Sequence, residues 1–103
     1  MTFANYGRLV AKPGERDRLA AILVRPSTEL EAVGCLLYEV GFNDDDADAV
    51  HVIELWESAE AHRASLELES VRAAIAEAMP LFAEAPSGSN FEVVGSPLRG
   101  LPA

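Results

Sequence analysis

The chain has 103 residues, 50% of them hydrophobic and 24% charged, a composition typical of one globular domain with its own core. Seventeen acidic and eight basic side chains give a formal net charge of −9, so the surface repels phosphate backbones and nucleic acid is excluded as a partner. No apolar run is long enough to span a membrane, and the first residues lack the pattern of a secretory signal. The lone cysteine, Cys35, fits a reducing compartment, so we expect a cytoplasmic protein without membrane contact.

The first third of the chain predicts a strand followed by helical segments. Residues 3–11 alternate in polarity and end at a Lys-Pro-Gly turn, which indicates a strand. Apolar side chains then recur at helical spacing from Glu15 until Pro26, where the helix is expected to stop. A Thr-x-x-Glu pattern that begins at Thr28 has the form of a capping box and predicts a short second helix, which Gly34 ends.

The middle of the chain predicts a β-hairpin and a helix behind it. Residues 35–42 are almost continuously apolar, the acidic stretch 43–48 is typical of a turn, and residues 50–56 form a second apolar run. Ser58 then stands where the N-cap of a helix belongs, and that helix should extend to about Leu66.

The last third predicts a helix, a loop and a strand. Ser70 is placed to cap a helix that runs through Met79 and is stopped by Pro80. The Pro-Ser-Gly-Ser stretch at 86–89 predicts a loop, and residues 90–94 predict a short final strand.

The resulting order, β-α-β-β-α-β, is that of a ferredoxin-like α+β fold, in which helices pack on one side of a four-stranded antiparallel sheet. The domain is expected over residues 3–95, and the Gly- and Pro-rich residues 96–103 are expected to form a tail. Strands 35–42 and 50–56 carry apolar side chains on both faces, yet the helices can cover only one. We therefore predict a homodimer whose two sheets pack face to face and close a barrel-like core.

Several short motifs occur together in a distinctive order. A Pro-Gly pair follows the first strand, a Gly-Cys pair opens the second, and the third ends in Glu-x-Trp, followed by Ser-x-x-Ala-His (Pro13, Gly14, Gly34, Cys35, Glu54, Trp56, Ser58, Ala61 and His62). With these motifs the chain resembles, from Phe3 to Val94, the antibiotic biosynthesis monooxygenase family. The resemblance implies a dimeric α+β barrel. Family members include cofactor-independent oxygenases of polyketide rings, quinol oxygenases, haem-degrading enzymes and proteins of unassigned role.

The haem-degrading branch of that family has an Asn on the first strand, a Trp at the end of the third and an iron-ligating His on the last helix. Trp56 matches this pattern, but Gly7 occupies the strand position, although Asn5 two residues earlier leaves the register open. The helix position falls near Ile75, and an apolar side chain cannot coordinate iron. Haem degradation is therefore not expected.

Three residues are candidates for catalysis. His62 suits general acid–base work on a phenol near neutral pH, or it is a solvated surface histidine. Trp56 can stack on a flat aromatic substrate, or it fills the core. Glu54 lies in an apolar strand, so it must be a base or be paired, with Arg8, Arg63 or the partner copy.

Four further residues are candidates for substrate binding. Tyr38 and Tyr6 can hydrogen-bond a substrate hydroxyl or carbonyl, or they are core residues with the hydroxyl at the rim. Asn5 or Arg8 can supply a donor to a developing oxyanion.

The sequence gives no support for a metal, a nucleotide or a flavin. The acidic turn that begins at Asp44 departs from the calcium-loop template, because its sixth position is Ala49 and its twelfth is Leu55. The two histidines, His51 and His62, lack metal-ligand spacing, and no glycine-rich phosphate loop is present. We therefore expect no cofactor.

Taken with the resemblance, these residues predict a monooxygenase that uses O₂ on a small electron-rich aromatic, such as a phenol, hydroquinone or polyketide-type ring. The alternative is a non-enzymatic dimer on the same scaffold, either a binder of small hydrophobic ligands or a stress-related protein. A sizeable cavity lined by Trp56, with polar groups converging in it, would favour the enzyme.

Overall fold

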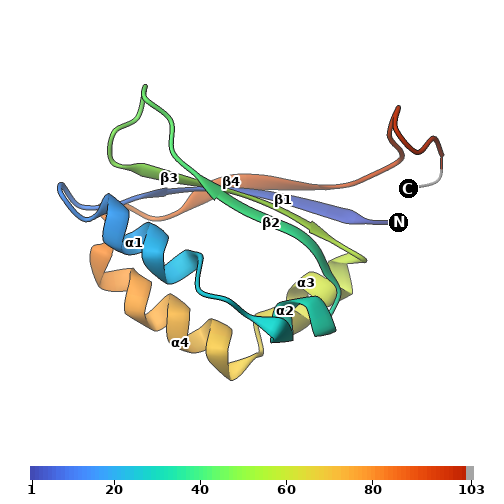
Figure 1. Ribbon diagram of the computed structural model, residues 1–103, viewed down its shortest axis with the longest axis horizontal. Helices are drawn as coiled ribbons and strands as arrows, with labels where there is room; N and C mark the ends of the chain where they lie inside the picture. The colour runs from blue at the N-terminus through green and yellow to red at the C-terminus, as the bar shows by residue number, and fades with distance from the viewer. Residues whose placement is uncertain (102–103) are drawn as a thin grey trace.

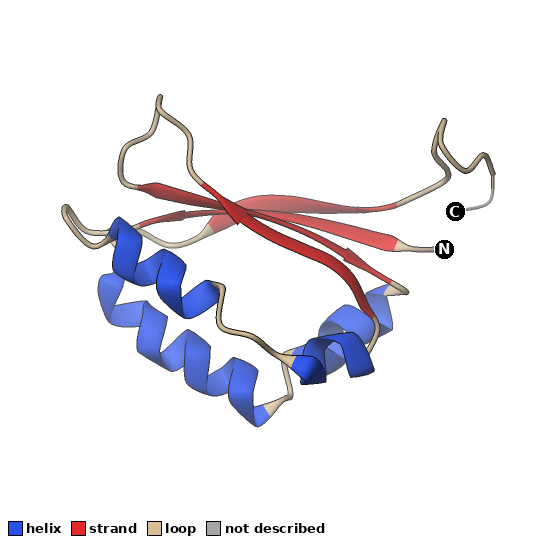
Figure 2. Cartoon of the chain, in the orientation of Figure 1, coloured by secondary structure: helices blue, strands red, loops and turns tan. Residues whose placement is uncertain are grey.

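The computed structural model describes residues 1–101, and the molecule is a four-stranded sheet with helices on one face (Figure 1, Figure 2). In chain order the elements are β1 (Phe3–Val10), α1 (Arg16–Leu23), α2 (Thr28–Ala32), β2 (Cys35–Gly41), β3 (Ala49–Trp56), α3 (Ala59–Ser65), α4 (Glu69–Ala78), a 3₁₀ turn (Met79–Leu81) and β4 (Ser87–Glu92). The strand order is β2-β3-β1-β4 and all neighbours are antiparallel. The ferredoxin-like α+β prediction is confirmed. Residues 102–103 of the expected tail lie outside the part of the chain that the structure describes.

The register of the sheet decides which side chains meet. β1 pairs with β3 so that Asn5 lies opposite Glu54, and β2 pairs with β3 so that Tyr38 also lies opposite Glu54. Side chains alternate between the two faces of a strand. The residues at this level of three strands therefore point together toward the helices.

Three local predictions need correction. The short second helix is capped by Ser27, whose Oγ accepts the Leu30 N–H, so Thr28 is the first residue inside the helix. The last long helix begins at Glu69, which places Ser70 within it. The final strand starts at Ser87 rather than at residue 90. Residues 87–89 are polar or glycine and have no strand pattern of their own, but they pair with the backbone of β1.

Ser58 caps α3 as predicted, since its Oγ accepts a hydrogen bond of 3.0 Å from the Ala61 N–H. The principal core lies at the other end of the sheet, where α1 and α4 pack on β1 and β3. Its buried members are Ala11, Leu19, Ile22, Val50, Ala78 and Leu81. This core fixes one end of the helical layer and leaves space between sheet and helices at the other.

The second face of the sheet is not covered by any helix in the described chain (Figure 1). Apolar side chains are exposed across three of its strands: Tyr6 on β1, Leu37 on β2 and Ile53 on β3. We call this surface the open face. Phe91 of β4 is 59% exposed and belongs to it as well. An apolar sheet face of this kind is typical of a surface that another molecule covers.

Candidate active site

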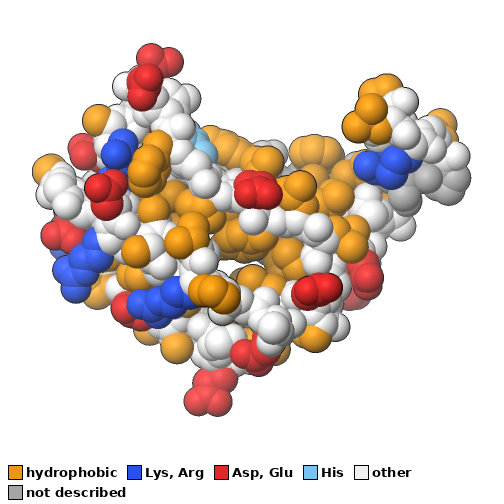
Figure 3. Space-filling model, viewed as in Figure 1, with side chains coloured by type: hydrophobic (Ala, Val, Ile, Leu, Met, Phe, Trp, Pro, Cys, Tyr) orange, Lys and Arg blue, Asp and Glu red, His pale blue; other side chains and the backbone are white. Residues whose placement is uncertain are grey.

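A cavity of about 760 Å³ lies between the sheet and the helices, and hydrophobic side chains gather in this hollow (Figure 3). Its helical wall is apolar where α1, α4 and the residues that follow α4 contribute Ile22, Leu23, Val71, Ala74, Ile75, Ala78 and Phe82. The same side also carries the polar residues Arg25, Ser27, Thr28, Glu29, Ser65 and Ser70. Its sheet wall carries the polar groups Asn5, Tyr38 and Glu54, beside Trp56. Pockets of this size and character hold small organic ligands.

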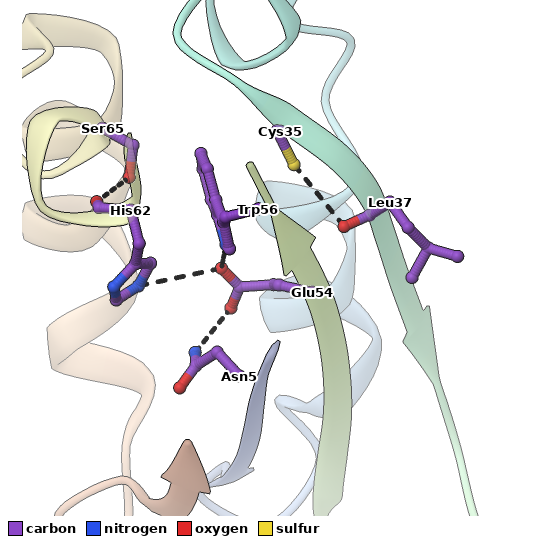
Figure 4. Close-up of polar contacts among 7 residues, drawn as sticks. All are labelled: Asn5, Cys35, Leu37, Glu54, Trp56, His62 and Ser65. Atoms are coloured by element: carbon purple, nitrogen blue, oxygen red, sulfur yellow. Dashed lines mark hydrogen bonds and ion pairs between the residues drawn. The ribbon is translucent and has the colours of Figure 1, made fainter. Parts of the chain in front are cut away.

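Glu54 is the centre of the polar cluster on the sheet wall (Figure 4). Its Oε2 accepts a hydrogen bond of 2.9 Å from Asn5 Nδ2, and its Oε1 accepts one of 3.0 Å from Trp56 Nε1. The side chain of Glu54 is only 11% exposed. A buried carboxylate requires such donors, because a carboxylate without hydrogen-bond partners would lose its hydration with nothing to compensate for it.

These partners differ from the ones expected from the sequence. Arg8 pairs with Asp46, through contacts of 2.5 and 2.7 Å, and Arg63 pairs with Glu60 on the helix surface. Glu54 is therefore satisfied by neutral donors within its own chain rather than by an arginine.

His62 projects from α3 toward this cluster (Figure 4). Its Nε2 lies 3.9 Å from Glu54 Oε1, and its ring is flanked by Trp56, edge-on at a centroid distance of 5.4 Å, and by Phe3, tilted at 5.5 Å. α3 begins directly behind β3, so a single turn of helix carries the imidazole back over the strand end. Two rings and a carboxylate thus hold the imidazole in one place.

Tyr38 lies opposite Glu54 and lines the same cavity. Burial raises the pKa of the Tyr38 phenol, and the nearby Glu54 and Cys35 raise it further. The hydroxyl therefore stays protonated across the physiological range and is a hydrogen-bond donor. The thiol of Cys35 donates to the Leu37 carbonyl at 3.5 Å, and its burial raises the thiol pKa.

The structure does not bring all the predicted site residues together. One cavity is lined by five of the predicted residues, which come from β1, β2, β3 and α3: Asn5, Tyr38, Glu54, Trp56 and His62. Tyr6 and Arg8 lie on the open face instead, because they alternate with Asn5 along β1.

On that face the Tyr6 hydroxyl lies 2.8 Å from Nδ1 of His51, and the two rings stack. Arg8 is held there by its ion pair with Asp46. Neither Tyr6 nor Arg8 therefore faces the cavity that holds the other five residues.

Two contributors to the site were not found by sequence reasoning. Phe3 packs against the imidazole of His62, and Ser65 donates its hydroxyl to the His62 carbonyl at 2.6 Å. Ser65 is buried and lines the cavity. The signal that could have indicated it is its position one helical turn after His62.

Residues 1–101 contain no cluster of three or more potential metal-ligating side chains. Within the same range no helix is long and apolar enough to cross a membrane. The features that define the site are thus an apolar hollow and one hydrogen-bonded polar cluster, held on a ferredoxin-like α+β scaffold.

Several solved structures share this architecture. A protein of Chloroflexus aurantiacus, named as a candidate antibiotic biosynthesis monooxygenase, is 40% identical, with a TM-score of 0.83, and the match covers 93% of this chain and 96% of that one. Rv0793 of Mycobacterium tuberculosis superposes with a TM-score of 0.81 at 18% identity, over 94% of this chain and 99% of that one. A comparison with curated proteins finds no match.

The family model described as antibiotic biosynthesis monooxygenase matches residues 2–77. This chain therefore belongs to the antibiotic biosynthesis monooxygenase family, as its motifs indicated. A further candidate member, from Caulobacter crescentus, shares the fold with a TM-score of 0.77 at 21% identity, over 90% of each chain.

Proposed function

We propose that this protein is a monooxygenase that uses O₂ to oxidise a small electron-rich aromatic, a phenol or hydroquinone, without a bound cofactor. The observation that carries the proposal is the convergence of Glu54, Trp56 and His62 at one end of an apolar cavity of about 760 Å³. An aromatic ring fits the apolar wall, and the polar groups stand where its hydroxyl would lie.

The chemistry asks little of the protein beyond a dry cavity, a proton acceptor and a donor. Removal of the phenolic proton gives an electron-rich phenolate, which transfers electrons to O₂ and forms a carbon–oxygen bond. Loss of water from the resulting peroxide then leaves a quinone. The sum is phenol plus O₂ to quinone plus water, so atoms and electrons balance without a further reductant.

The groups of the site match these needs. His62 or Glu54 would take the phenolic proton. Trp56 would stack on the ring. The protonated hydroxyl of Tyr38 would donate to the oxygen that gains negative charge.

We further propose that the working form is a homodimer in the cytoplasm and that a second copy covers the open face. The described chain exposes 6568 Å², whereas a compact monomer of 11.0 kDa should expose roughly 5,600 Å². The difference is comparable to the roughly 800 Å² that each partner contributes to a stable interface. Apolar side chains on all four strands of that face support the same assembly.

The test of the activity is oxygen consumption with a panel of phenols, naphthols and hydroquinones, with the quinone product identified by mass spectrometry. His62→Gln should lower kcat by about 10²- to 10⁴-fold. Glu60→Gln, which removes a carboxylate whose side chain is 80% exposed on α3, is the matched control and should retain full activity. Absence of oxygen uptake by the natural protein with every member of the panel would refute the proposal and favour a ligand-binding role.

A further inference from the structure

The structure distinguishes between the two candidate proton acceptors. We propose that His62 takes the phenolic proton and that Glu54, held by Asn5, is a positioning residue that stabilises the imidazolium ion formed. This inference rests on the proposed function for its substrate class, but the proton transfer itself can be measured without any reaction with O₂.

Glu54 is hydrogen-bonded through both of its carboxylate oxygens. Each carboxylate oxygen faces an N–H: Asn5 Nδ2 at 2.9 Å and the indole Nε1 of Trp56 at 3.0 Å. The indole nitrogen of Trp56 and the amide nitrogen of Asn5 can each donate a hydrogen bond but cannot accept one. A carboxylate accepts both hydrogen bonds, one on each oxygen. Both oxygens of Glu54 thus act as acceptors, and the proposed relay uses Glu54 as a carboxylate.

His62 faces the same carboxylate. Its Nε2 lies 3.9 Å from Glu54 Oε1, so a positive charge on the ring would face a fixed negative charge. In the tautomer that directs the Nε2 proton toward Glu54, Nδ1 keeps the lone pair that can accept a proton. The phenolic O–H bond breaks, an N–H bond forms on Nδ1, and the products are a phenolate and an imidazolium ion beside Glu54.

The cluster is held in place by paired strands and by two aromatic rings. Asn5 comes from β1, which is paired with β3 at the level of Glu54. The rings of Trp56 and Phe3 hold the imidazole from two sides. Asn5 and His62 each face Glu54, on different carboxylate oxygens, so the effect of Asn5 on the imidazole passes through the carboxylate.

The probe for the experiment is 4-nitrophenol, because only its ionised form absorbs strongly in the visible range. Binding is followed independently by the fluorescence of Trp56, the single tryptophan of the chain, which lines the cavity. The quantity measured is the ratio of ionised to neutral probe in the bound state at one fixed pH. The variants are Glu54→Gln, Asn5→Ala and His62→Gln, and the first two are also combined with His62→Gln.

With His62 present, Glu54→Gln should lower the ratio by about tenfold or more, and Asn5→Ala should lower it in the same direction. In the His62→Gln background neither change should lower it further, because no imidazolium remains to be stabilised. Glu60→Gln, at a side chain that is 80% exposed on α3, should leave the ratio unchanged. Asn5→Ala carries the test if Glu54→Gln does not fold.

Several results would overturn the inference. If Glu54→Gln lowers the ratio equally with and without His62, Glu54 itself accepts the proton. If the ratio is insensitive to Glu54 and Asn5, or if the natural protein binds the probe only in its neutral form or does not bind it, the assigned roles are wrong. If the probe ionises as expected but no phenol supports oxygen uptake, the proton relay stands and the oxygenase proposal fails.

Discussion

The substitution Trp56→Phe tests whether the polar cluster is a structural unit as well as a candidate active site. Trp56 is 1% exposed and donates its indole N–H to Glu54 at 3.0 Å. Phenylalanine keeps an aromatic ring but has no N–H, so the buried carboxylate loses one of its two hydrogen bonds. A hydrogen bond to a charged group contributes about 1.5–3 kcal/mol. With the ring contacts that the smaller side chain forfeits, we expect unfolding to be easier by about 2–4 kcal/mol.

The assay is urea unfolding followed by far-ultraviolet circular dichroism, since the substitution removes the only tryptophan. Protein concentration must be held constant, because dimer formation would add to the measured stability. Leu98→Ala, at a side chain that is 91% exposed, serves as control and should change the free energy of unfolding by less than about 0.5 kcal/mol.

A double-mutant cycle with Glu54→Gln isolates the hydrogen bond from the packing. Residues that share a hydrogen bond show interaction energies of about 0.5–3 kcal/mol, whereas independent sites add. If the loss from Trp56→Phe is below about 1 kcal/mol, or if the two substitutions add without interaction, then the indole does not hold Glu54 and the reasoning about the cluster is wrong.

Three further predictions concern other parts of the molecule. Burial raises the pKa of Tyr38, so Tyr38 should not contribute to the rise in tyrosinate absorbance near about pH 10. That rise should therefore be the same in Tyr38→Phe as in the natural protein. A smaller rise in the variant would contradict the burial of Tyr38. The folded chain keeps this proton where the unfolded chain loses it, so the stability contributed by Tyr38 declines as the pH rises above that range. Ile53→Glu places a charge on the open face, where Ile53 is 49% exposed, and light scattering should report monomer where the natural protein gives dimer; equal masses would refute the proposed interface. The Arg25 guanidinium lowers the pKa of Glu77, so the ion pair between Arg25 and Glu77 persists in mildly acidic solution and is lost as the pH falls through that lowered pKa. Glu77→Gln should shift the urea midpoint slightly at low salt and not at high salt, because salt screens exposed ion pairs.

Much of the fold could be predicted because its signals are local. The turn after β1, the apolar runs of β2 and β3 and the N-cap at Ser58 each depend on neighbouring residues. β4 was displaced in the prediction because Ser87, Gly88 and Ser89 have no apolar pattern. They are strand residues only because β1 supplies their hydrogen-bonding partners, and such a partnership is not visible in the segment itself.

The cavity residues show the same division between local and distant information. Strand alternation alone separates Asn5 from Tyr6 and Arg8, so the placement of the latter two on the open face was available from the sequence. The inward position of Tyr38 was less accessible. An irregularity between Cys35 and Leu37 shifts the register of β2 against β3, and a bulge of this kind inverts the faces that simple alternation would assign.

The role of Glu54 depends on distances that no sequence pattern encodes. A carboxylate in an apolar strand predicts a buried partner, and arginine is the partner that charge alone suggests. The structure supplies an amide 49 positions away along the chain and an indole two positions away. Neutral donors stabilise the negative charge of Glu54 without cancelling it, so the field of the carboxylate still acts on its surroundings. An arginine in the same place would neutralise that field, and His62 at 3.9 Å would gain little from it. In the proposed relay, an amide rather than a cation at position 5 leaves the field of Glu54 to act on the imidazole, and Asn5→Ala tests whether the hydrogen bond from Asn5 matters to it.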